Sequence, residues 1–310
     1  MAAGAPAGRF GSEETVVSVI GSRSGDGSWP AAASPRRPPF RSDTRSRRET
    51  QNAGRAAQIV GATGAAPPAG PRDSRYPVGL SRSARIFVMS QPLTIDFVSD
   101  VACPWCAVGL SSLLIALERV GDAADVQIRM HPFELNPNMG PEGESIVEHI
   151  GKKYGRTPEQ VAEAQAMLRE RGASVGFTFG QREAIHNTFD AHRLLHWAGL
   201  EGRQLPLKLE LLRACHGEGK RTDDPELLAA AAQAAGLDAE RAREVLASGA
   251  YAGEVRAAER EAQALGISSV PSVIFNERYL VTGGQPAEAF ERAIRQILAE
   301  AAEPTAGPTA

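Results

Sequence analysis

The chain has 310 residues and a net charge of −3, but its charge is divided unevenly along its length. Residues 1–88 carry 13 Arg, no Lys and 6 acidic residues, whereas the remainder carries 21 basic and 31 acidic residues, a net charge of −10. This acidic body disfavours nucleic acid as the main partner, and no apolar stretch reaches the roughly 18 residues that a membrane-spanning helix needs.

Residues 1–88 are predicted to be a disordered extension rich in Ala, Gly, Ser, Pro and Arg. The apolar run at 16–20 is isolated, so the segment cannot bury enough surface to offset its ordering entropy. The segment lacks the continuous apolar region of a secretory signal, so a cytoplasmic location is expected. A transit peptide is disfavoured because no amphipathic helix is evident, and a basic arm for nucleic acid because the Arg residues are not clustered. Because Met89 directly precedes the first predicted strand, we hypothesise that translation begins there.

The first part of the body is predicted to be a βαβ unit. The apolar run at 93–98 indicates a strand, the amphipathic run at 104–120 a helix, and the alternating residues 126–130 a second strand. Two strands joined through a helix in this way are expected to be parallel.

A long helical region follows, from about 144 to 248. Thr157, Asp224 and Asp238 each precede residues typical of a first helical turn, and we expect them to cap three of its helices. A further helix is predicted at 251–265.

The C-terminal part returns to β structure before a last helix. The runs 272–275 and 279–281 are separated by three polar residues, which predicts an antiparallel hairpin. A helix beginning at Pro286 is expected to end the fold, and residues 303–310 are expected to fray.

Cys103-Pro104-Trp105-Cys106 stands at the junction of the first strand and helix. The unpaired amide groups and the dipole of a helix N-terminus favour a thiolate on Cys103. Cys106 lies about one turn further on, where its sulfur can attack a mixed disulfide formed by Cys103. The pattern therefore indicates dithiol–disulfide chemistry.

Several separate stretches of the body carry a resemblance to a known family. They are residues 99–106, 133–143, 187–193, 266–271 and 284–286. In this order they are similar to the DsbA family of thioredoxin-like oxidoreductases, in particular its FrnE-like subgroup. The resemblance covers the chain from Ser90 to about Glu300.

The resemblance implies an α/β, thioredoxin-like fold with an inserted all-helical domain. Residues 89–137 and 249–302 are then expected to form the thioredoxin-like domain, and residues 138–248 the inserted helical domain. The extension at 1–88 has no counterpart in this pattern.

The resemblance also implies roles for individual residues. Cys103 would be the attacking, partly exposed thiolate, Cys106 the resolving thiol, and Val270-Pro271 a cis-proline loop that offers backbone groups to substrate. The expected partners are protein or small-molecule thiols and disulfides. No metal or organic cofactor is needed, and glutathione can serve as a redox partner.

Five further side chains are candidates for the site. Trp105 is expected to be an exposed apolar contact for substrate, and the resemblance suggests that Phe133 and Asn187 line a cleft between the domains. Asp100 and Asp96 could raise the pKa of a nearby thiol by charge repulsion or take its proton during exchange.

Three alternatives compete with the redox interpretation. The first is that the two cysteines form half of a zinc site. Zinc needs four ligands, and the remaining cysteine, Cys215, is adjacent to His216, whereas adjacent residues rarely bind the same metal ion. A glutathione-dependent isomerase of the 2-hydroxychromene-2-carboxylate isomerase type is another, although such relatives typically carry Ser where Cys103 stands. The third is a non-catalytic protein-binding or chaperone module. The sequence leaves redox direction, potential, physiological substrate and oligomeric state open.

Overall fold

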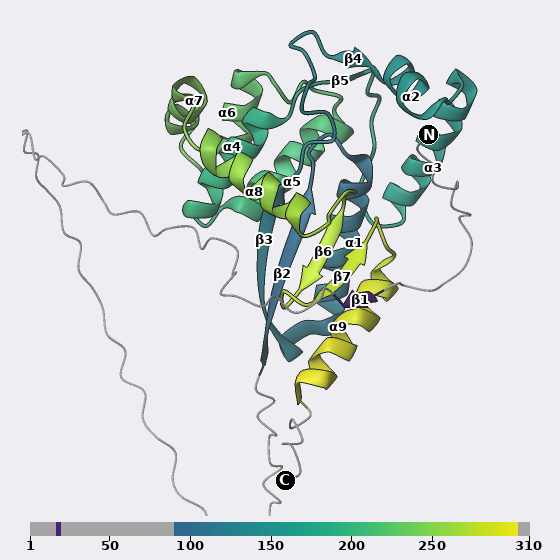
Figure 1. Ribbon diagram of the computed structural model, residues 1–310, viewed down its shortest axis with the longest axis vertical. Helices are drawn as coiled ribbons and strands as arrows, with labels where there is room; N and C mark the ends of the chain where they lie inside the picture. The colour runs from purple at the N-terminus through teal and green to yellow at the C-terminus, as the bar shows by residue number, and fades with distance from the viewer. Residues whose placement is uncertain (1–16, 20–89, 303–310) are drawn as a thin grey trace, which may run out of the picture. The chain divides into compact units, whose positions relative to one another are not determined.

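The computed structural model describes residues 17–19 and 90–302 (Figure 1). The predicted start at Met89 and the predicted fraying of residues 303–310 lie outside these residues. The disorder predicted for residues 1–88 is contradicted at 17–19, which form the short strand β1, and the rest of that prediction also lies outside the described residues. Among the helices described, none is both long and apolar enough to cross a membrane.

The described strands form a five-stranded sheet in the order β1-β7-β6-β2-β3, and a separate pair. The strands of the sheet are β1 (Val17–Val19), β2 (Gln91–Ser99), β3 (Ala124–Pro132), β6 (Ser272–Phe275) and β7 (Tyr279–Thr282). β2 and β3 are parallel and β6 and β7 are antiparallel, which confirms the predicted βαβ unit and hairpin. β1 pairs with the outer edge of β7, whose backbone groups would otherwise lack strand partners, and this pairing explains why an isolated apolar run becomes a strand.

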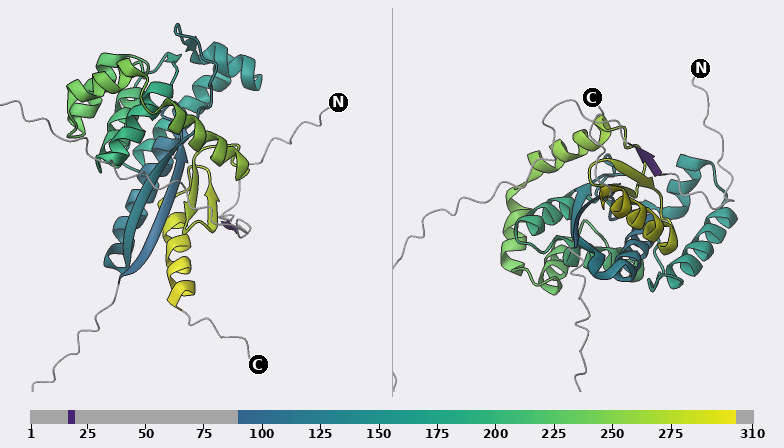
Figure 2. Two further views of the ribbon diagram at one scale, coloured as in Figure 1. Left: turned by 60° about the vertical axis from the view of Figure 1, so that its left-hand side comes forward. Right: turned by 90° about the horizontal axis from the view of Figure 1, so that it is seen from below.

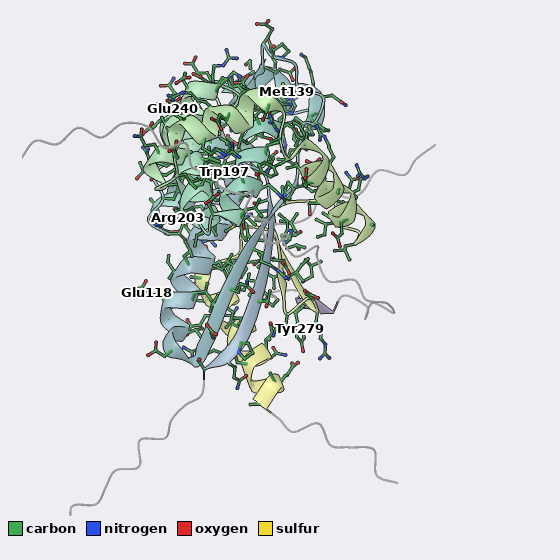
Figure 3. The ribbon with its side chains drawn as sticks, turned by 90° about the vertical axis from the view of Figure 1, so that its left-hand side faces the viewer. Glu118, Met139, Trp197, Arg203, Glu240 and Tyr279 are labelled. Carbon is green, nitrogen blue, oxygen red and sulfur yellow. The ribbon has the colours of Figure 1, made fainter. Side chains whose placement is uncertain are left out.

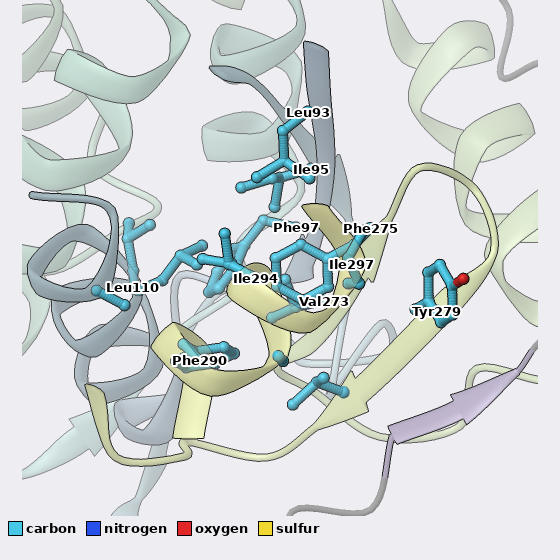
Figure 4. Close-up of a cluster of buried hydrophobic side chains, with 14 of the residues drawn as sticks. Leu93, Ile95, Phe97, Leu110, Val273, Phe275, Tyr279, Phe290, Ile294 and Ile297 are labelled. Atoms are coloured by element: carbon cyan, nitrogen blue, oxygen red, sulfur yellow. The ribbon is translucent and has the colours of Figure 1, made fainter. Parts of the chain in front are cut away.

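Alternating side chains of β2 separate the two faces of the sheet. The helices that pack on these faces are α1 (Pro104–Val120), α9 (Ala287–Ala302) and α8 (Ala252–Ala264). Ile95 and Phe97 are fully buried in a core shared with α1 and α9 (Figure 4). Val98 points the other way and packs with Ile274 and with Ala262 of α8. The first face is therefore covered by two helices and the second by α8.

The segment between β3 and α8 is mainly helical, as predicted. Its helices are α2 (Ile146–Tyr154), α3 (Pro158–Ala173), α4 (Phe189–Leu200), α5 (Gln204–Leu212), α6 (Pro225–Ala234) and α7 (Ala239–Ser248), with a π-helical turn at Arg213–Gly217. The side chains of Thr157, Asp224 and Asp238 cap α3, α6 and α7, which confirms the predicted helix starts. The prediction of helix throughout is wrong at β4 (Glu144–Ser145) and β5 (Ala184–Ile185), which pair with each other, because two-residue strands carry no periodic signal.

The helices α4 to α7 gather at one end of the sheet (Figure 2). They share a hydrophobic core of their own. Trp197 lies among these helices, and Tyr279 lies at the sheet (Figure 3). Val101, in the turn that follows β2, is fully buried in the helical core. Leu212 of α5 packs instead in the core of the sheet. The turn after β2 and helix α5 therefore join the two cores, and this junction positions the site.

Candidate active site

Cys103 lies where the turn after β2 becomes helix α1. It occupies the N-cap position with extended backbone angles (φ −83°, ψ 114°), and Pro104 is the first helical residue, as predicted. The Cys106 amide donates to the Cys103 carbonyl oxygen at 3.1 Å and closes the first turn. Because the first amide groups of a helix have no partner within it, they stabilise a thiolate at this position.

Both thiols are shielded from solvent. The exposed fraction is 4% for Cys103 and 0% for Cys106, and neither is in a disulfide. The Cys103 Sγ donates a hydrogen bond to the Val270 carbonyl oxygen 3.6 Å away. The partial exposure predicted for Cys103 is therefore wrong for this dithiol form, because the loop at Val270 lies against the sulfur.

The two thiols differ in acidity. Hydrogen bonding from Cys106 is the largest influence on Cys103 and lowers its pKa, burial opposes this, and the amide groups of Cys106 and Trp105 lower the pKa further. Burial is the largest influence on Cys106 and raises its pKa well above the usual value, and hydrogen bonding to Cys103 adds to this. The arrangement provides one thiol poised to act as a thiolate and a second that stays protonated.

The loop at Pro271 packs tightly against the start of α1. The Val270–Pro271 peptide bond is cis. A Cβ added to Gly109 of α1 would lie 3.0 Å from the Pro271 ring, and one added to Gly284 would lie 3.1 Å from Trp105. Both positions thus allow a close approach that a larger residue would obstruct. The sequence analysis missed the role of Gly109, although a glycine inside an otherwise apolar helix is a signal of close packing.

Asp100 ties the active-site turn to the loop after β3. One carboxylate oxygen accepts a hydrogen bond from the Ala102 amide at 3.1 Å, and the other accepts one from the Leu135 amide at 2.8 Å. His192 Nε2 of α4 lies 3.4 Å from the carboxylate. Burial alone would raise the pKa of Asp100, but His192 and the two amides lower it to about 2. The resulting negative charge raises the pKa of Cys103, as the sequence analysis considered.

Asp96 lies on the opposite face of β2 from the core that contains Ile95. It is fully buried and accepts two hydrogen bonds from the Arg129 guanidinium, at 2.6 and 2.7 Å. His131 Nε2 lies 2.7 Å from the same carboxylate. Burial raises the pKa of Asp96, but these two partners outweigh it and lower the pKa. Asp100 therefore lies near the thiols, whereas Asp96 is paired with Arg129 and His131 of β3.

The three predicted substrate contacts occupy different surroundings. Trp105 is half-buried, contrary to the predicted exposure, because it packs against Gly284. Phe133 is half-buried and packs against the apolar cluster of Val98 and Ile274, against which Val270 also packs. The Asn187 side chain accepts a hydrogen bond from the first amide of α4 at 2.8 Å and donates to a loop carbonyl at 3.5 Å. The Asn187 side chain therefore links the start of α4 to the loop at Met139. Its role toward substrate stays a prediction.

Two charged side chains near the thiols were missed by the sequence analysis. Arg182 donates to the Ala102 carbonyl oxygen at 3.1 Å, and Lys208 of α5 is completely buried. Lys208 interacts electrostatically with Cys106 and Cys103. The sequence signal for Lys208 was its place among the leucines of a predicted apolar helix, where a lysine is unusual. Cys215 is fully buried in the helical core, and no cluster of three or more His, Cys, Asp or Glu side chains in the described residues could hold a metal ion.

Comparisons with known proteins agree with this fold. The family described as the DSBA-like thioredoxin domain matches residues 94–295. A probable DsbA oxidoreductase from Streptomyces coelicolor has 36% sequence identity and a TM-score of 0.64, over 68% of this chain and 92% of that one. A search of curated proteins found no match.

Two more distant structures share the fold alone. A candidate protein disulfide isomerase from Nitrosomonas europaea has 19% identity and a TM-score of 0.52, over 68% of this chain and 99% of that one. A 2-hydroxychromene-2-carboxylate isomerase has 16% identity and a TM-score of 0.52, over 67% of this chain and 98% of that one. The family match extends from β2 into α9 and includes both thiols and the cis-proline loop. The chain therefore belongs to the DSBA-like thioredoxin domain family.

Proposed function

We propose that this protein is a thiol–disulfide oxidoreductase in which Cys103 attacks and Cys106 resolves. The observation that carries the proposal is the pair of thiols at the start of α1, whose pKa values are shifted in opposite directions. The similarity to the Streptomyces protein, itself described as a probable DsbA oxidoreductase, supports the same chemistry.

The proposed reaction has two exchange steps. The Cys103 thiolate attacks one sulfur of a substrate disulfide, a Cys103–substrate disulfide forms, and the other substrate sulfur leaves as a thiolate. The Cys106 sulfur then attacks Cys103, the Cys103–Cys106 disulfide forms, and the second substrate sulfur leaves. Two substrate sulfurs are reduced and two protein sulfurs are oxidised, and the reverse sequence oxidises a substrate dithiol.

The cis-proline loop has a role in holding substrate in this proposal. In the dithiol form the Val270 carbonyl accepts the hydrogen bond of the Cys103 thiol. A thiolate or a disulfide has no S–H to donate, so the carbonyl then becomes available to an amide of an extended substrate. Trp105 packs against Gly284, and Phe133 packs against the same apolar cluster as Val270, so both would contact the apolar part of that substrate.

The finer features of the proposal rest on sequence resemblance. We propose that the protein is of the FrnE-like type, that its partners are protein or small-molecule thiols including glutathione, and that it acts in the cytoplasm without a metal or organic cofactor. The isomerase alternative has the same fold, but a complete pair of thiols favours redox chemistry over it.

Reduction of insulin disulfides by the purified protein tests the proposal. We expect Cys103→Ser to be inert, and Cys106→Ser to accumulate mixed disulfides through Cys103. Cys215→Ala is the matched control, because this third cysteine lies in the helical core, and it should behave as the wild type. A wild-type protein that neither exchanges disulfides nor traps a partner in the Cys106→Ser form would refute the proposal.

A further inference from the structure

Lys208 is the one described lysine that is completely buried. Its Nζ has no hydrogen-bond partner among the described residues. Lysine is almost never fully buried unless it is paired, because desolvation of an ammonium group is costly. An unpartnered buried amine in the middle of α5 therefore requires an explanation that packing does not give.

The packing of α5 directs Lys208 toward the active-site turn. Leu212, one turn further on the same face, packs in the core that holds Ala107, the residue after Cys106. Leu211, three residues on, packs in the helical core that holds Val101, two residues before Cys103. Two neighbours of Lys208 on this face of α5 thus belong to the two cores that also hold residues on either side of the thiols.

The charged and titratable groups around Lys208 come from three segments. Cys106 and Cys103 at the start of α1, Asp100 in the preceding turn, and Cys215 in the π-helical turn interact with its amine, and the amine in turn affects His216. Among these partners, Cys106 has the largest electrostatic interaction with Lys208. Cys106, the thiol that must lose a proton in the second exchange step, is therefore the titratable group with which the amine interacts most strongly, although no hydrogen bond joins the two in the dithiol form.

We propose that Lys208 is the base that accepts the proton of Cys106 when the mixed disulfide is resolved. This inference rests on the proposed function. It assigns a proton-transfer role to a residue of the inserted helical domain, outside the thioredoxin-like part of the chain.

The step is balanced within the site. The neutral Lys208 amine takes the proton from the Cys106 Sγ through one bridging water molecule and becomes an ammonium group. The Cys106 thiolate attacks the Cys103 Sγ, the bond between the two cysteines forms, and the bond from Cys103 to the substrate sulfur breaks. The substrate leaves as a thiolate and is then protonated, and the ammonium group returns its proton to solvent. Burial lowers the pKa of Lys208, which favours the neutral amine that the step requires.

The other groups near Cys106 are poor bases. The Asp100 carboxylate is occupied by two backbone amides and by His192, and its pKa of about 2 makes it a weak acceptor for a thiol proton. His216 Nε2 lies 2.9 Å from the Val101 carbonyl oxygen and donates to it, and burial lowers the pKa of His216 to about 3. Of these groups, Lys208 is the one whose basicity suits the removal of a proton from the Cys106 thiol.

The reaction of the reduced protein with the chromogenic disulfide dithiobis(nitrobenzoate) separates the two steps. Attack by Cys103 releases a first thionitrobenzoate, and resolution by Cys106 releases a second. The Cys106→Ser variant should show the first phase alone, which assigns the phases. Lys208→Met should slow the second phase by about 100-fold near neutral pH and change the first phase much less.

Lys220 provides the matched control. It is a half-exposed lysine that pairs with Glu218 on the surface, so Lys220→Met should leave both phases unchanged. Methionine nearly matches the buried part of lysine in volume and removes an unpartnered polar group, so Lys208→Met should melt no lower than the wild type. A cooperative melting transition shows that the variant is folded.

The pH dependence distinguishes a base from a structural residue. In the wild type the rate of the second phase should depend less steeply on pH than in Lys208→Met, where it should rise about tenfold per pH unit as hydroxide replaces the amine. Equal second-phase rates in the two proteins, or an equally steep pH dependence in both, would overturn the inference. A wild type that releases no second thionitrobenzoate would instead refute the proposed function.

Discussion

At the scale of residues, the site depends on the buried Asp100 carboxylate and the two buried thiols, which lie at the turn between β2 and α1. Cys103 and Cys106 are chemically identical, yet hydrogen bonding at the helix N-terminus favours the thiolate of the first and burial disfavours that of the second. The place of the two cysteines at the start of a helix could be predicted from the sequence. The place of Lys208 could not, because the contact depends on how α5 packs against the turn, and no local pattern encodes that packing.

Asp100 should make the stability of the protein depend on pH at the acidic end. Its pKa is lowered from 3.8 to about 2 in the folded protein, so its contribution is present above about pH 4 and is lost as the pH falls through 2. The contribution amounts to about 2 kcal/mol of unfolding free energy. Asp100→Asn should therefore lose less stability than the wild type between these pH values, as measured by urea unfolding.

Asp122, exposed after the end of α1, supplies the control for this experiment. Asp122→Asn should follow the wild-type curve across the same range. If Asp100→Asn did so as well, the ionised carboxylate would not be what ties the turn to the loop at Leu135.

At the scale of elements, the junction of β2, α1 and the Pro271 loop is the part of the fold that the site needs most. The strands, the hairpin and the helix caps could be predicted, because each has a local pattern of alternation or of capping residues. The pairing of β4 with β5 and of β1 with β7 could not, since β1, β4 and β5 are two or three residues long and gain their partners only in the folded chain.

Gly109 should be required for the contact between α1 and Pro271. Gly109→Ala places a methyl group 3.0 Å from the proline ring, and we expect it to destabilise the protein by about 1–3 kcal/mol and to slow attack by Cys103. Gly253 is the matched control because no atom lies within 4 Å of an added Cβ in α8. Gly253→Ala should be neutral or stabilising, by up to about 1 kcal/mol, through its higher helix propensity. Equal melting temperatures for the two variants would contradict the close packing described here.

At the scale of the whole molecule, two cores meet at the active-site turn. Val101 anchors the turn in the helical core, while Ala107, just beyond the thiols, belongs to the core of the sheet. The helical insertion could be predicted from the order of the elements in the chain. Their contribution of His192 and Lys208 to the thiol site could not, because it arises from contacts between segments about 100 residues apart.

A chain that begins at Met89 should fold and keep its thiol chemistry. It would lack β1, which pairs three residues with the edge of β7 and none with the strand that leads to Cys103. We expect a loss of about 1–3 kcal/mol in unfolding free energy and unchanged rates of disulfide exchange, compared with the full chain. Loss of cooperative unfolding or of exchange in the shortened chain would show that residues before Met89 are part of the functional unit.

The central claim is that Cys103 and Cys106 alternate between a dithiol and a shared disulfide through an adduct on Cys103. Intact mass and peptide mapping after equilibration in a glutathione redox buffer test it most directly. The wild type should lose two hydrogens and yield a Cys103–Cys106 cross-linked peptide, and Cys106→Ser should carry glutathione on Cys103. An unmodified Cys103 in that variant, or a wild-type cross-link that involves Cys215, would contradict the account.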